Sequence, residues 1–183
     1  MSRIIVEAEV SLDGIVNSPE IWPEIFKYHT DDVQDYLNKL LLSSDALVLG
    51  RQTYEVFADV WPARTGEQAE YINKMPKYVA SRTLRKPLRW NSTLLQGDVA
   101  GELQKLKQAD GNNMVQYGVG EFTRTMLNHG LVDELQLLVF PFTFGKGGRW
   151  FDIIDMRHFK LLECKSFESG AILLRYEPVA NRL

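Results

Sequence analysis

A short strand that ends in glycine and opens a helix is the stretch of this sequence best suited to chemistry. Ala46–Leu49 is an apolar run too short for a helix and typical of a strand buried on both faces. Gly50 ends the strand, and residues 51–57 begin a predicted helix whose free N–H groups and dipole favour a phosphate. Arg51 adds a planar cation, and the Thr53 hydroxyl lies in the first turn. An ordinary strand–turn–helix with a solvated arginine is the alternative interpretation.

A second junction of the same kind follows a later strand. Residues 114–117 form a predicted strand, Gly118-Val119-Gly120 end it, and residues 122–128 form the next predicted helix. This junction would suit a diphosphate. The triplet alone is a weak motif, because it lacks the GxGxxG spacing and the acidic partner of the Rossmann fingerprint.

The first predicted strand, residues 3–10, carries two acidic side chains and ends in an Asp13-Gly14 turn. Alternation places Ile5, Glu7 and Glu9 on one face of this strand. Either that face is simply wet, or Glu7 or Glu9 lines a polar cleft.

Other catalytic arrangements are not indicated. His29, His129 and His158 have no second histidine or acid at metal-ligand spacing, so we expect no metal site. The single cysteine, Cys164, lies in no nucleophile motif, and neither G-x-S-x-G nor a Walker A sequence occurs. With two anion-binding helix starts and no nucleophile, the chain is expected to take its chemistry from a cofactor.

The elements that must position these residues alternate between strand and helix, and strands dominate near the end of the chain. This order predicts an α/β fold in one domain over residues 1–183, with a mostly parallel sheet that finishes antiparallel. Residues 17–30 are interpreted as a long loop, of the kind that forms lids or binding loops. The remaining predicted elements are helices at 31–41, 67–74 and 99–107, strands at 77–83 and 93–96, a strand region at 131–144 broken at Pro141, and a hairpin of 159–167 with 171–176.

Composition narrows the partners. The 183 residues carry a net charge of −3 and no Lys/Arg cluster dense enough for a nucleic-acid footprint. No apolar run reaches the length of a membrane span, and no signal peptide is recognised. One cysteine cannot form an internal disulfide. We therefore expect a cytoplasmic protein that acts on a small molecule, without nucleic-acid or membrane partners.

Six motifs occur in order along the chain: Ser11-Leu-Asp-Gly14, Leu49-Gly-Arg-Gln-Thr-Tyr-Glu55, Lys77-Tyr-Val-Ala-Ser-Arg-Thr-Leu84, Gly118-Val-Gly120, Gly130-Leu-Val-Asp-Glu-Leu135 and Pro141…Gly145-Lys-Gly147…Phe151. Together they resemble the dihydrofolate-reductase-like superfamily. Within it, the resemblance is to stand-alone proteins similar to the reductase domain of the riboflavin-biosynthesis deaminase/reductase. It implies a three-layer α/β fold, with a mixed, mostly parallel central sheet, helices on both faces and a C-terminal antiparallel hairpin.

The resemblance implies an NADPH cofactor lying along the carboxyl ends of the strands. The matching positions are Val10, Ser11 and Gly14 beside the nicotinamide, Gly50, Arg51 and Thr53 at the first phosphate-binding helix, Ser81, Arg82 and Thr83 around the adenosine 2′-phosphate, and Tyr117, Gly118, Val119, Gly120, Glu121 and Phe122 at the glycine pair. Because Arg51 and Arg82 could both meet that phosphate, we expect a preference for NADPH over NADH.

The sequence departs from the pattern on the substrate side. Tyr117 stands where riboflavin reductases usually carry an acid, and residues 58–62 replace their Asn-Pro-x-Leu-Thr-x-Arg segment. Dihydrofolate reductases protonate pterin with a helix carboxylate, for which Asp31, Asp32 and Asp35 are candidates. The NADPH half of the pattern matches, and the substrate half does not.

The leading hypothesis is an NADPH-dependent reductase of a small heterocyclic or carbonyl-like substrate, resembling 5-amino-6-(5-phosphoribosylamino)uracil reductase. Glu9, Asp13 or water would supply the proton. A dihydrofolate or pterin reductase, and an NADP-binding relative without turnover, are the alternatives.

A homodimer is also expected, because the late strands hold more large apolar side chains than one sheet face can hide. These residues are Leu137, Leu138, Phe140, Phe142, Phe144, Trp150 and Phe151. Packing of the same residues inside a well-covered core is the alternative.

Overall fold

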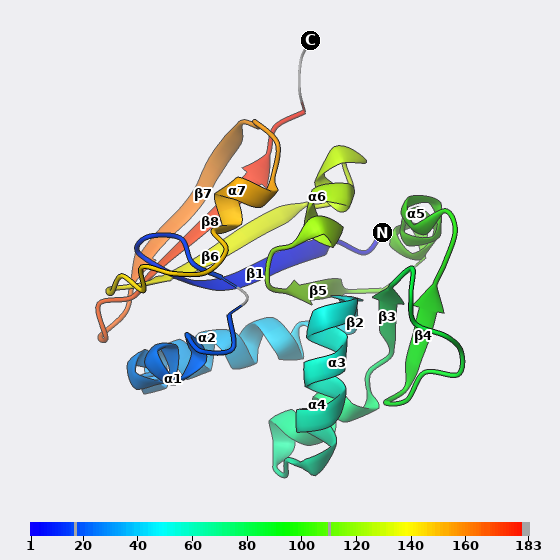
Figure 1. Cartoon of the computed structure of the whole chain (residues 1–183), viewed down its shortest axis with the longest axis horizontal. Coiled ribbons are helices and arrows are strands. Elements are labelled where there is room, and N and C mark those ends of the chain that lie inside the picture. The colour runs from blue at the N-terminus through cyan, green and yellow to red at the C-terminus, as the bar shows by residue number, and fades with distance from the viewer. Residues whose placement is uncertain (17, 110, 181–183) are drawn as a thin grey trace.

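The computed structural model describes residues 1–16, 18–109 and 111–180, and it is built around one mixed sheet (Figure 1). The strand order is β4-β3-β2-β5-β1-β6-β8-β7. The first six strands in this order pair in parallel, and β8 joins β6 and β7 antiparallel. The predicted α/β fold, with its C-terminal antiparallel hairpin, is confirmed. The strands are β1 Ile4–Ser11, β2 Ser44–Gly50, β3 Lys77–Ala80, β4 Ser92–Leu95, β5 Asn113–Tyr117, β6 Glu134–Phe140, β7 Phe159–Ser166 and β8 Ile172–Pro178.

Helices cover both faces of the sheet and complete three layers (Figure 1). Leu41, Tyr54 and Ile72, from α2, α3 and α4, pack with the face of β1 that holds Ile5. Leu103 of α5 and Met126 of α6 belong to the core on the opposite face. The helices are α1 Trp22–Ile25, α2 Asp31–Leu42, α3 Arg51–Val60, α4 Glu67–Lys74, α5 Val99–Gln108, α6 Glu121–Asn128 and α7 Trp150–Ile153, with 3-10 helices at Phe26–Tyr28 and Trp61–Ala63.

Strand β1 lies in the middle of the sheet, between β5 and β6. Ile4, Val6, Ala8 and Val10 are fully buried on one of its faces. Glu7, on the other face, is only 2% exposed. The interpretation of that face as simply wet is therefore wrong for Glu7, because α2 and α3 cover it.

The segment 17–30 is more ordered than the predicted loop; residue 17 itself lies outside the described residues. Pro23 occupies the first turn of α1, a position that suits its missing N–H. Ile21 and Ile25 lie one helical turn apart and are fully buried. This turn fixes the chain that leads to His29.

The predicted strand regions at 77–83 and 131–144 are shorter in the structure. β3 ends at Ala80, where Ser81 begins a turn. β6 ends at Phe140, because Pro141 has no N–H to continue a ladder.

The apolar residues behind the expected dimer divide between core and surface. Leu137, Leu138 and Phe140 are buried within the chain. Leu161 and Leu162, on the edge strand β7, are 51% and 42% exposed. The core alternative thus accounts for part of the surplus, and the dimer stays a prediction that now depends on β7.

In the described part of the chain, no helix combines the length and apolar character needed to cross a membrane.

Candidate active site

The predicted cofactor positions lie along one edge of the sheet. β3, β2, β5 and β1 are parallel, so their carboxyl ends meet at this edge. Gly50 pairs with Ala80, which places Ser81 beside the start of α3. A Cβ on Gly50 would lie 3.6 Å from Cβ of Phe122, so the starts of α3 and α6 are also neighbours. The fold brings together three segments that the sequence separates by up to 70 residues.

At the first junction, the predicted phosphate-binding side chains Arg51 and Thr53 already have partners within the protein. The Arg51 guanidinium lies 3.2 Å from the Glu55 carboxylate one turn along α3, and both side chains are about half exposed. The Thr53 hydroxyl donates to the Tyr117 carbonyl at 3.5 Å, which ties α3 to the end of β5.

The segment after β3 forms a tight turn around one hydroxyl. Ser81 Oγ accepts the N–H groups of Thr83 and Leu84 at 3.1 and 3.0 Å. Arg82 is exposed at this turn and, within the described residues, pairs with no carboxylate. It is a free cation at the place predicted for a 2′-phosphate.

Side-chain hydrogen bonds of Gln116 and Thr123 stabilise the glycine turn that follows β5. Gln116 Nε2 donates to the Gly118 carbonyl at 2.9 Å and to Thr123 Oγ1 at 2.7 Å, and Thr123 Oγ1 accepts the Gly120 N–H at 3.0 Å. Gly118 has φ +81°, which favours glycine. A Cβ on Gly120 would meet no atom within 4 Å. The start of α6 is therefore open to a ligand's close approach, and its residues fit a diphosphate.

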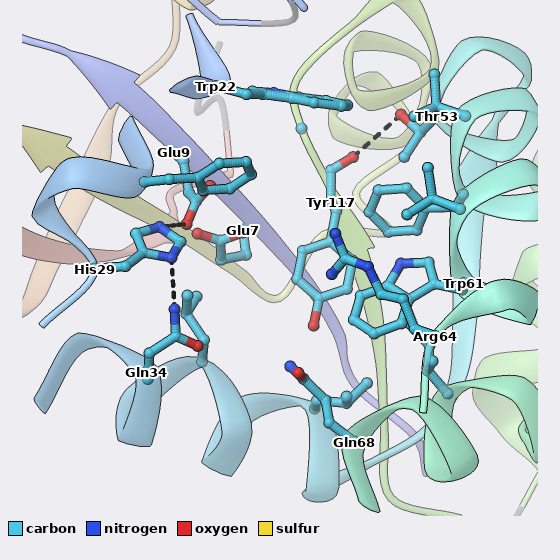
Figure 2. Close-up of a pocket in the computed structure, with 18 of the residues that line it drawn as sticks. Glu7, Glu9, Trp22, His29, Gln34, Thr53, Trp61, Arg64, Gln68 and Tyr117 are labelled. Atoms are coloured by element: carbon cyan, nitrogen blue, oxygen red, sulfur yellow. Dashed lines mark hydrogen bonds and ion pairs between the residues drawn. The ribbon is translucent and has the colours of Figure 1, made fainter. Parts of the chain in front are cut away.

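Beside this edge lies a cavity of about 680 Å³ between the strands β1 and β5 and the helices α2 and α3 (Figure 2). Of the predicted site residues, Glu9, Thr53, Tyr117 and Gly118 line it, and the other predicted cofactor residues lie outside its lining. Aromatic side chains form much of the wall. The lining residues are Glu7, Glu9, Val16, Trp22, Phe26, His29, Gln34, Leu37, Leu41, Thr53, Val56, Phe57, Val60, Trp61, Arg64, Gln68, Ile72, Tyr117 and Gly118.

Two carboxyl groups from β1 reach this cavity, as one of the two sequence interpretations expected. Glu9 Oε1 lies 2.8 Å from His29 Nε2, and Gln34 Nε2 lies 2.6 Å from Nδ1 of the same ring (Figure 2). Because an amide N–H only donates, Nδ1 accepts from Gln34, while Nε2 lies at ion-pair distance from Glu9 without forming a hydrogen bond to any described residue.

Glu7 has no such partner. Its Oε1 is buried and makes no hydrogen bond to any described residue. Burial, and then the charge of Glu9, raise the pKa of the Glu7 carboxyl well above its usual range. Burial and these two carboxylates also raise the pKa of the neighbouring Tyr117 hydroxyl.

Asp13, the other predicted catalytic residue, is engaged in the loop. Its carboxylate accepts hydrogen bonds from Ser11 Oγ at 2.6 Å and from the N–H groups of Phe144 and Gly145 at 3.0 and 2.8 Å. The Ser11 bond, followed by those backbone bonds, lowers the pKa of Asp13 to about 2. These contacts favour a structural role, in which Asp13 ties the end of β1 to the loop after β6.

The helix acids that were candidates for pterin protonation do not line the cavity. Asp32 accepts the N–H groups of Val33 and Glu168, and Asp31 and Asp35 are exposed. Gln34 is the polar residue that α2 presents to the cavity. The acids of this site come from the strand instead of the helix.

Several site residues carried no signal in the sequence. His29 lies in the segment interpreted as a loop, and only the turn of α1 brings it to Glu9. Trp61 lies within residues 58–62, the segment that departs from the riboflavin-reductase pattern, and Arg64 follows it; that departure was the available signal. The Arg64 guanidinium carbon lies 4.8 Å from the centroid of the Trp61 ring at the cavity.

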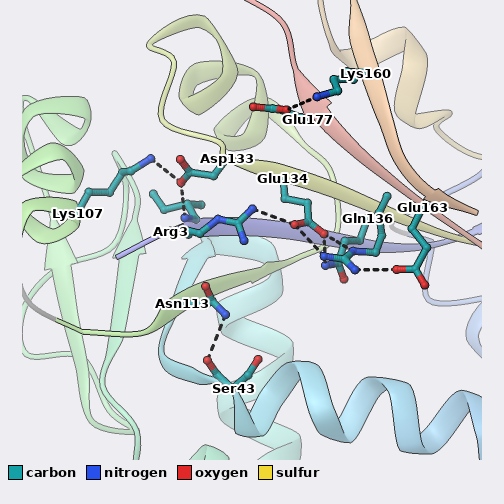
Figure 3. Close-up of polar contacts among 12 residues, drawn as sticks. Arg3, Ser43, Lys107, Asn113, Asp133, Glu134, Gln136, Lys160, Glu163 and Glu177 are labelled. Carbon is teal, nitrogen blue, oxygen red and sulfur yellow. Dashed lines mark hydrogen bonds and ion pairs between the residues drawn. The ribbon is translucent and has the colours of Figure 1, made fainter. Parts of the chain in front are cut away.

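Polar contacts elsewhere hold the sheet together (Figure 3). Glu134 is buried and forms ion pairs with Arg3 and Arg175. Asp133 accepts the Ile4 N–H at 2.7 Å and pairs with Lys107. No group of three or more His, Cys, Asp or Glu side chains arranged to hold a metal occurs among the residues with described positions.

Comparison with known proteins agrees with this architecture. The family model of the RibD C-terminal domain matches residues 2–173. The uncharacterised protein YyaP of Bacillus subtilis strain 168 is 26% identical over 187 residues, covering 95% of this chain and 94% of YyaP.

Two solved structures show the same fold. RibD of Acinetobacter baumannii superposes with a TM-score of 0.70 at 17% identity, covering 98% of this chain and 58% of that chain. Dihydrofolate reductase of Enterococcus faecalis, solved in complex with NADP(H), superposes with a TM-score of 0.65 at 15% identity, covering 97% of each chain. The chain therefore belongs to the RibD C-terminal domain family and has a dihydrofolate-reductase-like fold.

Proposed function

We propose that the protein is an NADPH-dependent reductase of a small, flat heterocyclic or carbonyl-like substrate. The observation that carries this proposal is that the cavity adjoins the carboxyl ends of the parallel strands, where the predicted cofactor residues lie. Tyr117 and Gly118 line the cavity and also begin the glycine turn at the start of α6. A substrate in the cavity would therefore lie beside a cofactor held along the sheet edge.

The residues for the cofactor are those at the three junctions. Ser81, Arg82 and Thr83 would hold the 2′-phosphate, the starts of α3 and α6 the diphosphate, and the end of β1 the nicotinamide. When bound, this cofactor supplies two electrons and one hydrogen as hydride. The chain supplies orientation, exclusion of water and the proton.

The cavity supports a flat substrate with polar edges. Trp22, Phe57 and Trp61 line the cavity with aromatic rings, and Glu7 and Glu9 of β1 add carboxyl groups to the lining. Within the described residues Arg64 forms no ion pair, so its charge is available to an anionic substituent. These features support a pyrimidine that carries a phosphorylated group, as in 5-amino-6-(5-phosphoribosylamino)uracil.

NADPH titration followed by tryptophan fluorescence tests the proposal, because two of the four tryptophans line the cavity. We expect saturable quenching, followed by NADPH oxidation with one member of a pyrimidine and pteridine panel. Absence of NADPH binding would refute the function. Binding without oxidation across the panel would favour an NADP-binding relative without turnover.

A further inference from the structure

The two carboxyl groups in the cavity come from the same strand face but have different surroundings. Glu7 is 2% exposed, while the Glu9 side chain is 21% exposed. Glu9 has His29 Nε2 at 2.8 Å, whereas Glu7 Oε1 is buried and without a hydrogen bond in the described structure. Figure 2 shows both groups between His29 and Tyr117.

Glu7 has no ion-pair partner among the described residues, although Arg64 lines the same cavity. Arg175 is already bound to Glu134 and Glu163. The titratable and polar groups around Glu7 are Glu9 on β1, Tyr117 on β5, Glu134 and Gln136 on β6, Tyr36 and Gln34 on α2, and His29 before α2.

A buried carboxylate without a partner is costly, so such a group keeps its proton instead of ionising. Two nearby carboxyls with unequal environments divide into one acid and one ionised group. Here the two carboxyls differ in burial and in contacts, since Glu9 is the more exposed and lies at ion-pair distance from His29 Nε2.

The partner of Glu9 is also held in place. Gln34 fixes one nitrogen of the His29 ring, and the ring stacks on Phe140 with centroids 5.8 Å apart. The imidazole therefore cannot turn toward Glu7 without losing both contacts.

We propose that Glu7 is the catalytic proton donor of this site, with Glu9 and its contact to His29 beside it. The proposal rests on the reductase function given above. In the reduction of a C=N bond, hydride forms the new C–H bond and the π electrons move onto nitrogen. The nitrogen takes the Glu7 proton, NADPH is oxidised to NADP⁺, and solvent in the cavity returns a proton to the Glu7 carboxylate.

The protonation state can be measured without substrate, by carbon NMR of protein labelled at the glutamate carboxyl carbon. We expect one glutamate signal at the protonated position at pH 7. Glu7→Gln should remove this signal and, being isosteric with the neutral acid, should fold normally. Glu9→Gln should retain the signal but lower its titration midpoint, because a like charge has been removed.

The role in turnover follows from the same two variants. Glu7→Gln should lower kcat about 100-fold or more while leaving NADPH affinity unchanged. The proposal is overturned if every glutamate is ionised at pH 7, if Glu9→Gln alone removes the protonated signal, or if Glu7→Gln retains full turnover. Should Glu7→Gln fail to fold, persistence or loss of the signal in Glu9→Gln decides the assignment. Failure of the reductase function has a separate signature, since the unmodified protein would then not bind NADPH.

Discussion

Replacing Arg82 by alanine should reduce the preference for NADPH over NADH more than replacing Arg51. Both arginines lie near the carboxyl ends of the parallel strands, but their ion pairs in the cofactor-free protein differ. Arg82 is exposed and has no carboxylate partner among the residues whose positions are described, so it meets a 2′-phosphate without losing a bond. Arg51 must exchange its ion pair with Glu55 for the phosphate.

The size of the effect follows from these contacts. A hydrogen bond between charged groups contributes about 1.5–3 kcal/mol, and about 1.4 kcal/mol corresponds to a tenfold change in affinity. Arg82→Ala should therefore reduce the NADPH/NADH ratio by about 10-fold to 100-fold. An exposed ion pair is worth up to about 1 kcal/mol, so the loss at Arg51 should be several-fold smaller.

Fluorescence titration with both cofactors measures the ratio directly. Arg85→Ala is a matched control from the same turn, because the Arg85 guanidinium bonds to the carbonyls of Thr83 and Leu84. Arg85→Ala should leave the ratio unchanged. Equal affinities for NADPH and NADH in the unmodified protein, or an Arg82→Ala ratio equal to that of Arg85→Ala, would refute the reasoning.

Three further predictions concern stability and assembly. Burial alone would raise the pKa of Glu134, but the hydrogen bond from Arg175 holds that pKa below its usual value. The stabilisation that ionised Glu134 gives the fold should therefore be lost as pH falls through its folded pKa. Glu134→Gln should lower the free energy of unfolding by about 2 kcal/mol at pH 7, and urea unfolding should show a flatter dependence of stability on acid pH. Burial lowers the pKa of Lys77 to about 8, so the folded state releases this proton at a lower pH than the unfolded state does. Stability should therefore rise between about pH 8 and the usual lysine pKa of about 10.4. Lys77→Met should abolish that rise. The protein should be a homodimer through the β7 edge, and Leu161→Lys with Leu162→Lys should yield monomers; a light-scattering mass near 21.0 kDa for the unmodified protein at micromolar concentration would contradict the dimer.

Glycine and proline residues at the ends of helices and strands allowed much of the fold to be predicted. The helix at 67–74 has the predicted bounds because Gly66 precedes it and Pro76 closely follows it. The strand before Gly50 was recognised because a short apolar run ending in glycine has few other interpretations. The strand order of the sheet was not predicted, since no local pattern specifies which strands are neighbours.

The cavity was harder to predict because it depends on tertiary packing. Alternation along β1 identified the face that holds Glu7 and Glu9, but only the docking of α2 and α3 decides that this face is covered. His29 meets Glu9 across 20 residues of chain, through a single helical turn that has no strong periodicity. Neither contact could be read from residue spacing.

The central position of β1 has a consequence for how the chain assembles. Ile4 is hydrogen-bonded to Asp133, 129 residues away, and the strand pairs with β5 and β6 from the later part of the sequence. During synthesis, β1 must therefore remain without its neighbours until β5 and β6 have been made. Such distant pairing slows folding and leaves an apolar strand exposed to other chains in the meantime. The strand that carries the acids of the site is thus made well before the two strands that enclose it.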